Sequence, residues 1–556
     1  MSQLLAAAVE HHRSGRFRQA ETIYRRVLRQ DPCHADANHL FGLLAHQTGD
    51  NATAIQSIGK AVVANPQSAL YRFTLGVVLE AKGDAEAAMA SYREALALNA
   101  NDADAHNNLG LLLEKHEKPD EAMVCFERAT RINPDHVEAW VNFGRALQAR
   151  AKSADARACF EHALKLNPLL AEAHFGVGKS LGDQRKWAEA EACYRQALAM
   201  KADFVEAQNN LGTALLAQGR YREARAVLRR LMEMKHGPIR ATLEALEDER
   251  WSSDETSPSM CSIPRFKLVD RVDQLEYLLA KGLIDSTFSN AVARFRSLLD
   301  EVAGDGAITL PFDLARQVKV LCDSVIHYAD APAVASCAVN DSLDFRAIEE
   351  EYLSSPTPVV WFDDFLSPEA LQGLRRFCLE STIYFGADPA GYVSSYVTNG
   401  FNSSLLYQIA DELKLRMPRV IGTQFLSNMW VYRHQGGSKG VDAHTDYGAV
   451  TFNFWITPDS ANLDPDRGGI VIYEKEQPFD WDWMEVNKKK NTRQIRERIK
   501  SFLGSTEPIA IPYRANRAVL FHSNLFHRSD DIQFKEGFEN RRINISMLFG
   551  ERRQSD

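Results

Sequence analysis

The sequence of 556 residues lacks several features typical of membrane, secreted or polyanion-binding proteins. No stretch reaches about 18 consecutive apolar residues, and the opening MSQLLAAAVEHHRSGRF has no basic leader followed by an apolar core. The formal net charge is -9, so the clustered positive excess that phosphate binding needs is missing. We therefore expect a cytoplasmic protein that binds neither nucleic acid nor membrane.

Cysteine is scarce, and its 8 residues form no CxxC pair. Cys125, Cys159 and Cys193 recur at intervals of 34 residues. This regular spacing indicates small packing residues rather than disulfides or a zinc site. A single hydrophobic core is also excluded, because cores stop growing near about 250–300 residues and a longer chain divides into domains.

The N-terminal half repeats itself every 34 residues. Alanine, glycine and an aromatic or large apolar residue each recur at this step, and proline closes four of the units. The positions are Ala20, Ala54, Ala88, Ala122, Ala156, Ala190 and Ala224; Gly42, Gly76, Gly110, Gly144, Gly178 and Gly212; Tyr24, Ile58, Tyr92, Phe126, Phe160, Tyr194 and Leu228; and Pro32, Pro66, Pro134 and Pro168. Each unit carries two apolar patterns of helical period separated by a turn, which predicts pairs of closely crossing helices.

This pattern resembles the tetratricopeptide repeat over residues 1–238. The resemblance implies an all-α superhelix of seven repeats, whose concave groove binds a peptide or helix of a partner protein. Asn108, Asn142 and Asn210 share one repeat coordinate and are candidate contacts, because a row of amides can grip a peptide backbone. The row is similar to the asparagine ladder of O-linked N-acetylglucosamine transferase repeats. The alternative is that these amides only face solvent.

Residues 239–350 are predicted to be a linker and a helical connector. WSSDETSPSMCSIP (251–264) is polar and rich in serine and proline, as linkers are. From Leu268 to Tyr328 the apolar spacing is helical again, and nothing in it suggests chemistry.

Residues 351–556 are predicted to form a domain of short strands with flanking helices. Short β-type runs follow one another with turns between them: MWVYRH, AVTFNFWIT, GGIVIYE, PIAIPY, RAVLFH and RINISMLFG. Such a pattern is typical of a β-sandwich or jelly roll. The charge-rich stretch 477–507 interrupts the strands and is predicted to be helical. It is interpreted either as a solvated helix or as a lid in which Trp481 and Trp483 cover a cavity.

The strongest candidate for chemistry is AHTDYG, which places His444 and Asp446 two residues apart. Residues i and i+2 of an extended strand face the same side, so the imidazole and the carboxylate can meet one metal ion. His527 follows a later strand, and Arg541 and Arg542 open the last one. Two histidines and one carboxylate are typical of non-heme iron(II) oxygenases, where the open coordination positions take a 2-oxo acid and dioxygen.

Over about residues 355–550 these elements resemble the 2-oxoglutarate- and iron(II)-dependent dioxygenases, particularly those like prolyl hydroxylases. The resemblance implies a double-stranded β-helix, or jelly roll, whose catalytic iron(II) is bound by His444, Asp446 and His527. It also implies that 2-oxoglutarate is converted to succinate and carbon dioxide while the substrate is hydroxylated.

The same resemblance assigns the cofactor residues and leaves two choices open. Arg542 would pair with the far carboxylate of 2-oxoglutarate, and Tyr432 would donate a supporting hydrogen bond unless it is only a core aromatic. Arg541 competes with Arg542, and His522 competes with His527 for the third metal position.

The predicted function is hydroxylation of a polypeptide recruited by the repeat groove. The alternative is a protein-interaction scaffold whose oxygenase-like domain is inactive. A glycosyltransferase, suggested only by the style of the repeats, is disfavoured because the C-terminal half has no pair of nucleotide-binding βαβ units.

Overall fold

The computed structural model describes residues 2–240, 242, 260–302, 306–388, 390–478, 480–481, 486 and 493–551. Most of the predicted linker therefore lies outside the described residues, as does Trp483. The chain divides into two compact units, Met1–Ala202 and Asp203–Asp556.

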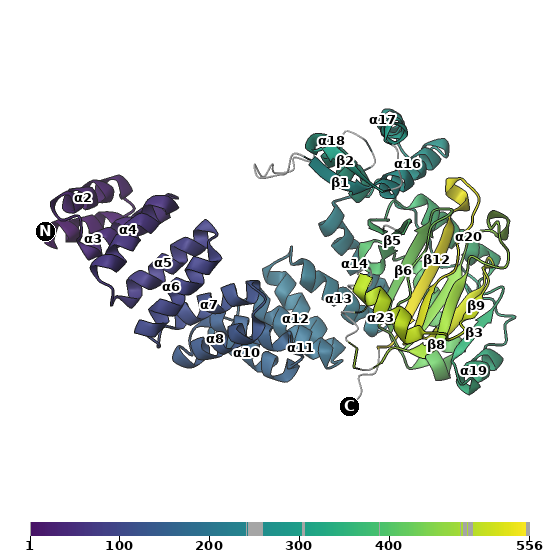
Figure 1. The fold of residues 1–556 in the computed structure, drawn as a ribbon. Helices are drawn as coiled ribbons and strands as arrows, with labels where there is room; N and C mark the ends of the chain where they lie inside the picture. The colour runs from purple at the N-terminus through teal and green to yellow at the C-terminus, as the bar shows by residue number, and fades with distance from the viewer. Residues whose placement is uncertain are drawn as a thin grey trace. The chain divides into compact units, whose positions relative to one another are not determined.

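The first unit is a succession of helix pairs (Figure 1). Its described helices are α1 (Ser2–Arg13), α2 (Phe17–Gln30), α3 (Ala35–Gln47), α4 (Asn51–Ala64), α5 (Ala69–Lys82), α6 (Ala85–Leu98), α7 (Ala103–Lys115), α8 (Pro119–Ile132), α9 (Val137–Gln148), α10 (Ser153–Leu166), α11 (Ala171–Asp183) and α12 (Trp187–Met200). A further pair with the same repeat pattern, α13 (Val205–Ala217) and α14 (Tyr221–His236), belongs to the second unit.

The repeated small residues lie where the two helices of a pair cross. Between α5 and α6, Gly83 ends the first helix with a φ of +88°, and Asp84 caps the second by accepting a hydrogen bond from the Ala87 amide. The ring of Tyr92 is fully buried, and a Cβ at Gly76 would lie 2.6 Å from it. The predicted close crossing of helices is confirmed at this position.

Gly76→Ala is expected to destabilise the repeats by about 1–3 kcal/mol, because the added methyl group overpacks the contact with Tyr92. The midpoint of urea unfolding of the full chain, followed by far-UV circular dichroism, measures the effect. Gly59→Ala is the matched control: this helical glycine has nothing within 4 Å of the added Cβ. The control should be neutral or stabilising by up to about 1 kcal/mol. Equal midpoints for the two variants would contradict the packing argument.

The second unit contains antiparallel sheets. The larger has seven strands in the order β3 (Val359–Phe362), β10 (Ala518–His522), β7 (Val450–Trp455), β12 (Arg542–Phe549), β6 (Leu426–His434), β5 (Tyr392–Tyr396) and β4 (Gly386–Asp388). The smaller has the order β11 (Leu525–Ser529), β8 (Ile470–Glu476) and β9 (Ile509–Ile511). The predicted strand-rich domain is confirmed, although the strands among the described residues form open sheets and no closed barrel.

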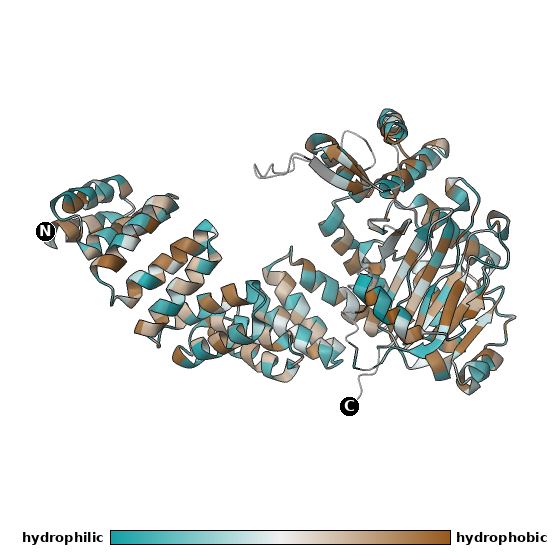
Figure 2. Cartoon of the chain, in the orientation of Figure 1, coloured by the Kyte–Doolittle hydropathy of each residue, from teal (hydrophilic) through white to brown (hydrophobic). Residues whose placement is uncertain are grey.

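The two sheets share a hydrophobic core. Trp455 and Phe521 from the larger sheet pack in one cluster with Ile472 and Ile511 from the smaller one. The strands of both sheets are rich in hydrophobic residues (Figure 2). Helices flank the sheets: α19 (Phe345–Ser354), α20 (Pro368–Glu380), α21 (Ser404–Arg416) and α23 (Arg493–Leu503).

The predicted helical connector has a small core of its own, which includes Leu275 and Phe295. It consists of α16 (Arg265–Ala280), α17 (Phe288–Glu301) and α18 (Phe312–Asp323), together with a pair of antiparallel strands, β1 (Met260–Pro264) and β2 (Ala307–Pro311). The helices agree with the sequence pattern, and the strand pair was not predicted. Helix α16 also contacts β5 and α20 of the strand-rich domain.

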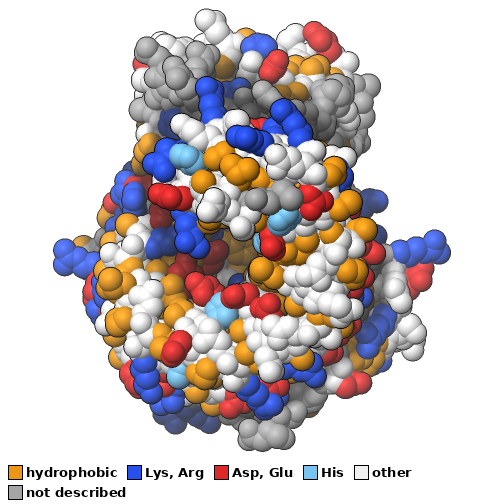
Figure 3. All heavy atoms as spheres, turned by 90° about the vertical axis from the view of Figure 1, so that its left-hand side faces the viewer, with side chains coloured by type: hydrophobic (Ala, Val, Ile, Leu, Met, Phe, Trp, Pro, Cys, Tyr) orange, Lys and Arg blue, Asp and Glu red, His pale blue; other side chains and the backbone are white. Residues whose placement is uncertain are grey.

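Among the described helices, none combines the length and the apolar character needed to cross a bilayer. On the face drawn in Figure 3, acidic, basic and hydrophobic side chains are interspersed.

Candidate metal centre

Two segments far apart in the sequence are joined at the candidate metal centre. His444 and Asp446 lie on the segment between β6 and β7, and His527 lies on β11. The backbones of His444 and His527 exchange two hydrogen bonds, with N···O distances of 3.0 and 2.9 Å. The Asp446 amide donates to the Ser523 carbonyl at 2.9 Å. These bonds fix the three predicted ligands side by side.

The three side chains converge. Nε2 of His444 lies 3.8 Å from Oδ1 of Asp446, and Nε2 of His527 lies 3.5 Å from Oδ2 of the same carboxylate. One ligand atom from each residue lies within 4.8 Å of the others, and the two imidazole centroids are 4.3 Å apart. The group could therefore hold one metal ion.

Hydrogen bonds orient each of these side chains toward the others. Nδ1 of His444 donates to the Asp442 carbonyl at 2.8 Å, and Nδ1 of His527 donates to the Leu525 carbonyl at 3.0 Å. In this tautomer the Nε2 lone pairs face Asp446, as in metal-binding histidines whose other nitrogen is held by a backbone carbonyl. Thr451 donates to Asp446 at 2.8 Å. This donor set fits a divalent transition-metal ion such as iron(II).

A small, partly open pocket lies beside the three residues. Arg542 lines it and is 2% exposed. One guanidinium nitrogen donates to the Gly469 carbonyl at 2.9 Å, whereas Nε has no hydrogen-bond partner among the described residues. No described carboxylate pairs with it, and burial lowers the pKa of Arg542 to about 10. A buried cation without an anion is costly, so the pocket is suited to a small acid.

His434 also lines this pocket and was missed by the sequence analysis. It is fully buried, faces Arg542 across the β6–β12 ladder, and its Nε2 has no partner among the described residues. Burial and the charge of Arg542 hold the pKa of His434 well below its usual value. Its position two residues after Tyr432 on one strand could have identified it, because such residues share a face.

The structure separates the alternatives that the sequence left open. Arg541 faces away from the pocket and forms ion pairs with Asp270 and Asp273 of α16. His522 lies on β10, outside the three-residue cluster, with Nδ1 3.2 Å from a carboxylate oxygen of Glu476.

Tyr432 lines the pocket. Burial raises the pKa of its hydroxyl well above its usual value, so it remains a proton donor. Its ring centroid lies 5.0 Å from that of Tyr392.

The described part of the insertion at 477–507 packs beside the site. The apolar face of α23, with Ile499 and Phe502, joins a cluster that includes Trp481, Phe526 and Ala443, the residue before His444. The helix is therefore packed against the segment that carries His444 rather than only decorating the sheet.

One member of the predicted asparagine row in the repeats, Asn142, is engaged within the protein. Asn142 is 8% exposed; it donates to Asn107 at 2.9 Å and accepts from Arg145 at 3.4 Å. These bonds use one donor and one acceptor of its amide, and its burial leaves little surface for the predicted groove contact. Asn108 and Asn210 are only partly buried.

Comparisons with known proteins concern the repeats. Tetratricopeptide-repeat models match residues 5–69, 81–116, 103–136, 141–181 and 178–235. The N-terminal part of the chain is thus a helical-repeat scaffold for protein interactions. Its repeat is the tetratricopeptide repeat, over roughly the first 240 residues. No curated protein matches the chain.

Several solved structures are similar to part of the chain. MamA is 27% identical and aligns over 29% of this chain and 94% of its own, with a TM-score of 0.28. PilF of Pseudomonas aeruginosa is 23% identical, over 36% and 88%, with a TM-score of 0.32. YrrB, described as a TPR protein with an unusual peptide-binding site, is 21% identical, over 34% and 96%, with a TM-score of 0.31.

Proposed function

We propose that the second unit carries a 2-oxoglutarate- and iron(II)-dependent oxygenase that hydroxylates a polypeptide bound by the tetratricopeptide repeats. The observation that supports this most is the convergence of His444, Asp446 and His527, within 4.8 Å of one another, beside the buried guanidinium of Arg542, whose Nε has no hydrogen-bond partner among the described residues. A chelating 2-oxo acid with a second carboxylate needs both a metal ion and a guanidinium that can bind that carboxylate, and this pocket offers residues for both.

The residues have distinct roles in this proposal. His444, Asp446 and His527 would hold iron(II), while the backbone carbonyls behind the imidazoles keep both Nε2 atoms turned inward. Arg542 would bind the far carboxylate of 2-oxoglutarate with its planar donors, and Tyr432 would donate a further hydrogen bond. When bound, the metal and the 2-oxo acid supply the oxidising chemistry, with succinate and carbon dioxide as by-products.

The sheets favour the same proposal. A double-stranded β-helix needs two sheets packed over a shared core, and the seven- and three-stranded sheets pack in this way. One ligand segment precedes a strand of the larger sheet, and His527 lies on the smaller sheet. The site therefore stands between the sheets, where a jelly roll holds its ligand.

The repeats favour a polypeptide substrate. Tetratricopeptide repeats bind proteins or peptides, and Asn108 and Asn210 are the members of the asparagine row that keep exposed surface for such a contact. A substrate held by the repeats would reach the oxygenase site at a raised effective concentration.

Succinate release from 2-oxoglutarate tests the proposal. The full chain with iron(II), oxygen and 2-oxoglutarate should release succinate, and anaerobic titration of the iron(II)-loaded protein with 2-oxoglutarate should give a weak visible charge-transfer band. The alternative, an interaction scaffold with an inactive oxygenase-like domain, predicts no succinate. Absence of both signals from folded protein would leave only the scaffold function.

A further inference from the structure

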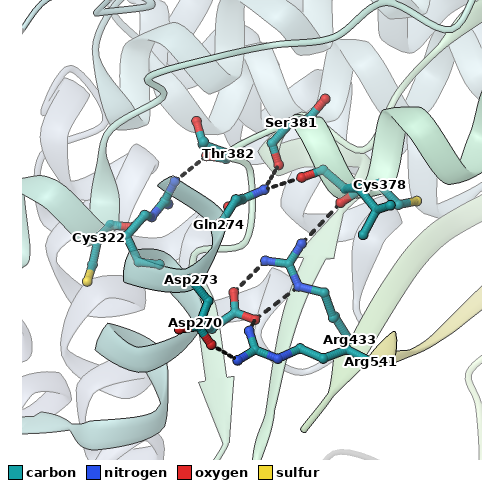
Figure 4. Close-up of polar contacts among 11 residues, drawn as sticks. Asp270, Asp273, Gln274, Cys322, Cys378, Ser381, Thr382, Arg433 and Arg541 are labelled. Carbon is teal, nitrogen blue, oxygen red and sulfur yellow. Dashed lines mark hydrogen bonds and ion pairs between the residues drawn. The ribbon is translucent and has the colours of Figure 1, made fainter. Parts of the chain in front are cut away.

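A buried network of charges joins the connector to the strand-rich domain (Figure 4). At its centre is Asp270 of α16, which is 7% exposed. Its carboxylate accepts hydrogen bonds from Arg433 Nε at 3.0 Å and from Arg541 Nη1 at 2.6 Å, and it also contacts Nη2 of Arg433. Arg541 pairs in addition with Asp273, one turn along the same helix. One carboxylate thus bridges two buried guanidinium groups.

The same helix is fastened at two further points. Gln274 donates to the carbonyls of Leu379 and Ser381, both at 2.9 Å. Arg271 donates to the carbonyls of Cys322 and Thr382, at 2.7 and 3.3 Å (Figure 4). Helix α16 is therefore bound to the end of α20 and to the sheet, and it is not a loose spacer.

The network lies directly behind the pocket. Arg433 stands on β6 between Tyr432 and His434, and Arg541 immediately precedes Arg542, the first residue of β12. Successive side chains of a strand point to opposite faces. Tyr432, His434 and Arg542 line the pocket, so Arg433 and Arg541 face the connector. Arg542 and His434 are also direct partners in the β6–β12 ladder.

The positions of the two arginines depend on Asp270 to different degrees. Arg433 is 1% exposed and lies over the rings of Tyr384 and Phe538, at 3.9 and 4.6 Å from their centroids. Among the described residues, Asp270 is its sole carboxylate partner, whereas Arg541 also has Asp273. Burial alone would raise the pKa of Asp270, but the two arginines hold it below its usual value. The carboxylate therefore stays charged, and its loss would leave Arg433 buried without a counter-ion.

We infer that Asp270 is a positioning residue for the pocket: by fixing Arg433 and Arg541 behind β6 and β12, it sets the placement of His434 and Arg542 in front of them. The connector then belongs to the cofactor site. That the ligand is 2-oxoglutarate rests on the proposed function, whereas the mechanical link between α16 and the two strands does not.

Asp270→Asn tests the inference, with Asp323→Asn as the matched control. Asp323, the last residue of α18 in the same connector, pairs with Lys267 of α16 at 2.5 Å and forms no ion pair with Arg433 or Arg541 among the described residues. For Asp270→Asn, the Kd of 2-oxoglutarate for the iron(II)-loaded protein should rise about tenfold, the lower end of what losing an outer partner costs at metal sites. The KM should rise in parallel, while kcat at saturation changes less than about threefold. Asp323→Asn should match the unaltered protein.

Hydrogen–deuterium exchange of the protein without cofactor gives a second readout. Amides of 426–434 and 542–549 should exchange faster in Asp270→Asn and not in Asp323→Asn, because the strands lose their support from behind. An unaltered Kd together with unaltered exchange in folded Asp270→Asn would overturn the inference.

Asp273→Asn replaces Asp270→Asn as the test if Asp270→Asn does not fold, because it removes one partner of Arg541 and leaves Asp270 in place. It should raise the Kd by about threefold, and an unaltered Kd and exchange there would equally overturn the inference. If the unaltered protein binds no 2-oxoglutarate, the proposed function fails, and the exchange measurement alone decides the role of Asp270.

Discussion

His527→Ala is expected to abolish iron(II)-dependent turnover of 2-oxoglutarate, with a loss of at least about a hundredfold. The variant removes one of three converging ligands. In the unaltered protein, Nε2 of His527 lies 3.5 Å from the Asp446 carboxylate. Losing one of three protein ligands weakens the binding of a labile divalent ion. Iron(II) binding by anaerobic equilibrium dialysis and succinate release should therefore fall together, and His444→Ala should behave in the same way.

His522→Ala is the control for this prediction. The residue lies five positions earlier, its side chain is 34% exposed, and it contacts Glu476 rather than the candidate ligands. Its loss should change iron(II) affinity and turnover by less than about twofold, because it lies outside the three-residue cluster. Normal iron binding in His527→Ala, or equal losses in the two variants, would contradict the assignment of the third ligand.

The sequence predicts the repeats well because their determinants are local. Glycine, alanine and an aromatic or large apolar residue recur with the helical-pair period, and each repeated glycine is needed where a large side chain such as that of Tyr92 or Ile58 approaches its backbone. The same period runs on through α14, so the sequence contains no sign that α13 and α14 group with the second unit. Their grouping rests on long-range contacts such as the stacked rings of Tyr221 and Tyr407.

In the candidate site, too, only the features with local determinants could be predicted from the sequence. His444 and Asp446 could be predicted together, because their spacing of two places them on one face of an extended segment. The ion pairs of Asp270 with Arg433 and Arg541 span 163 and 271 positions, so no local sequence pattern predicts them. Asn142 failed as a free contact for a similar reason: its partner Asn107 lies one repeat away, 35 positions earlier.

Arg542→Gln is expected to raise the Kd of 2-oxoglutarate by about 10- to 150-fold, because hydrogen bonds to charged groups contribute about 1.5–3 kcal/mol. Isothermal titration of the iron(II)-loaded protein under anaerobic conditions measures the change. 2-Oxobutyrate is the matched control ligand: it keeps the chelating 2-oxo acid and lacks the far carboxylate. 2-Oxobutyrate should bind more weakly than 2-oxoglutarate to the unaltered protein, and its Kd should be the same for the unaltered protein and for Arg542→Gln.

Stability provides an independent check on Arg542. The guanidinium is buried, makes one hydrogen bond to Gly469, and has no carboxylate partner among the described residues, so its charge is a cost to the fold. Arg542→Gln should therefore melt at the same or a higher temperature than the unaltered protein while binding 2-oxoglutarate far less well. A group that weakens the fold and strengthens ligand binding is typical of a functional site. A lower melting temperature with unaltered 2-oxoglutarate affinity would instead make Arg542 a structural residue and leave the far carboxylate without an assigned partner.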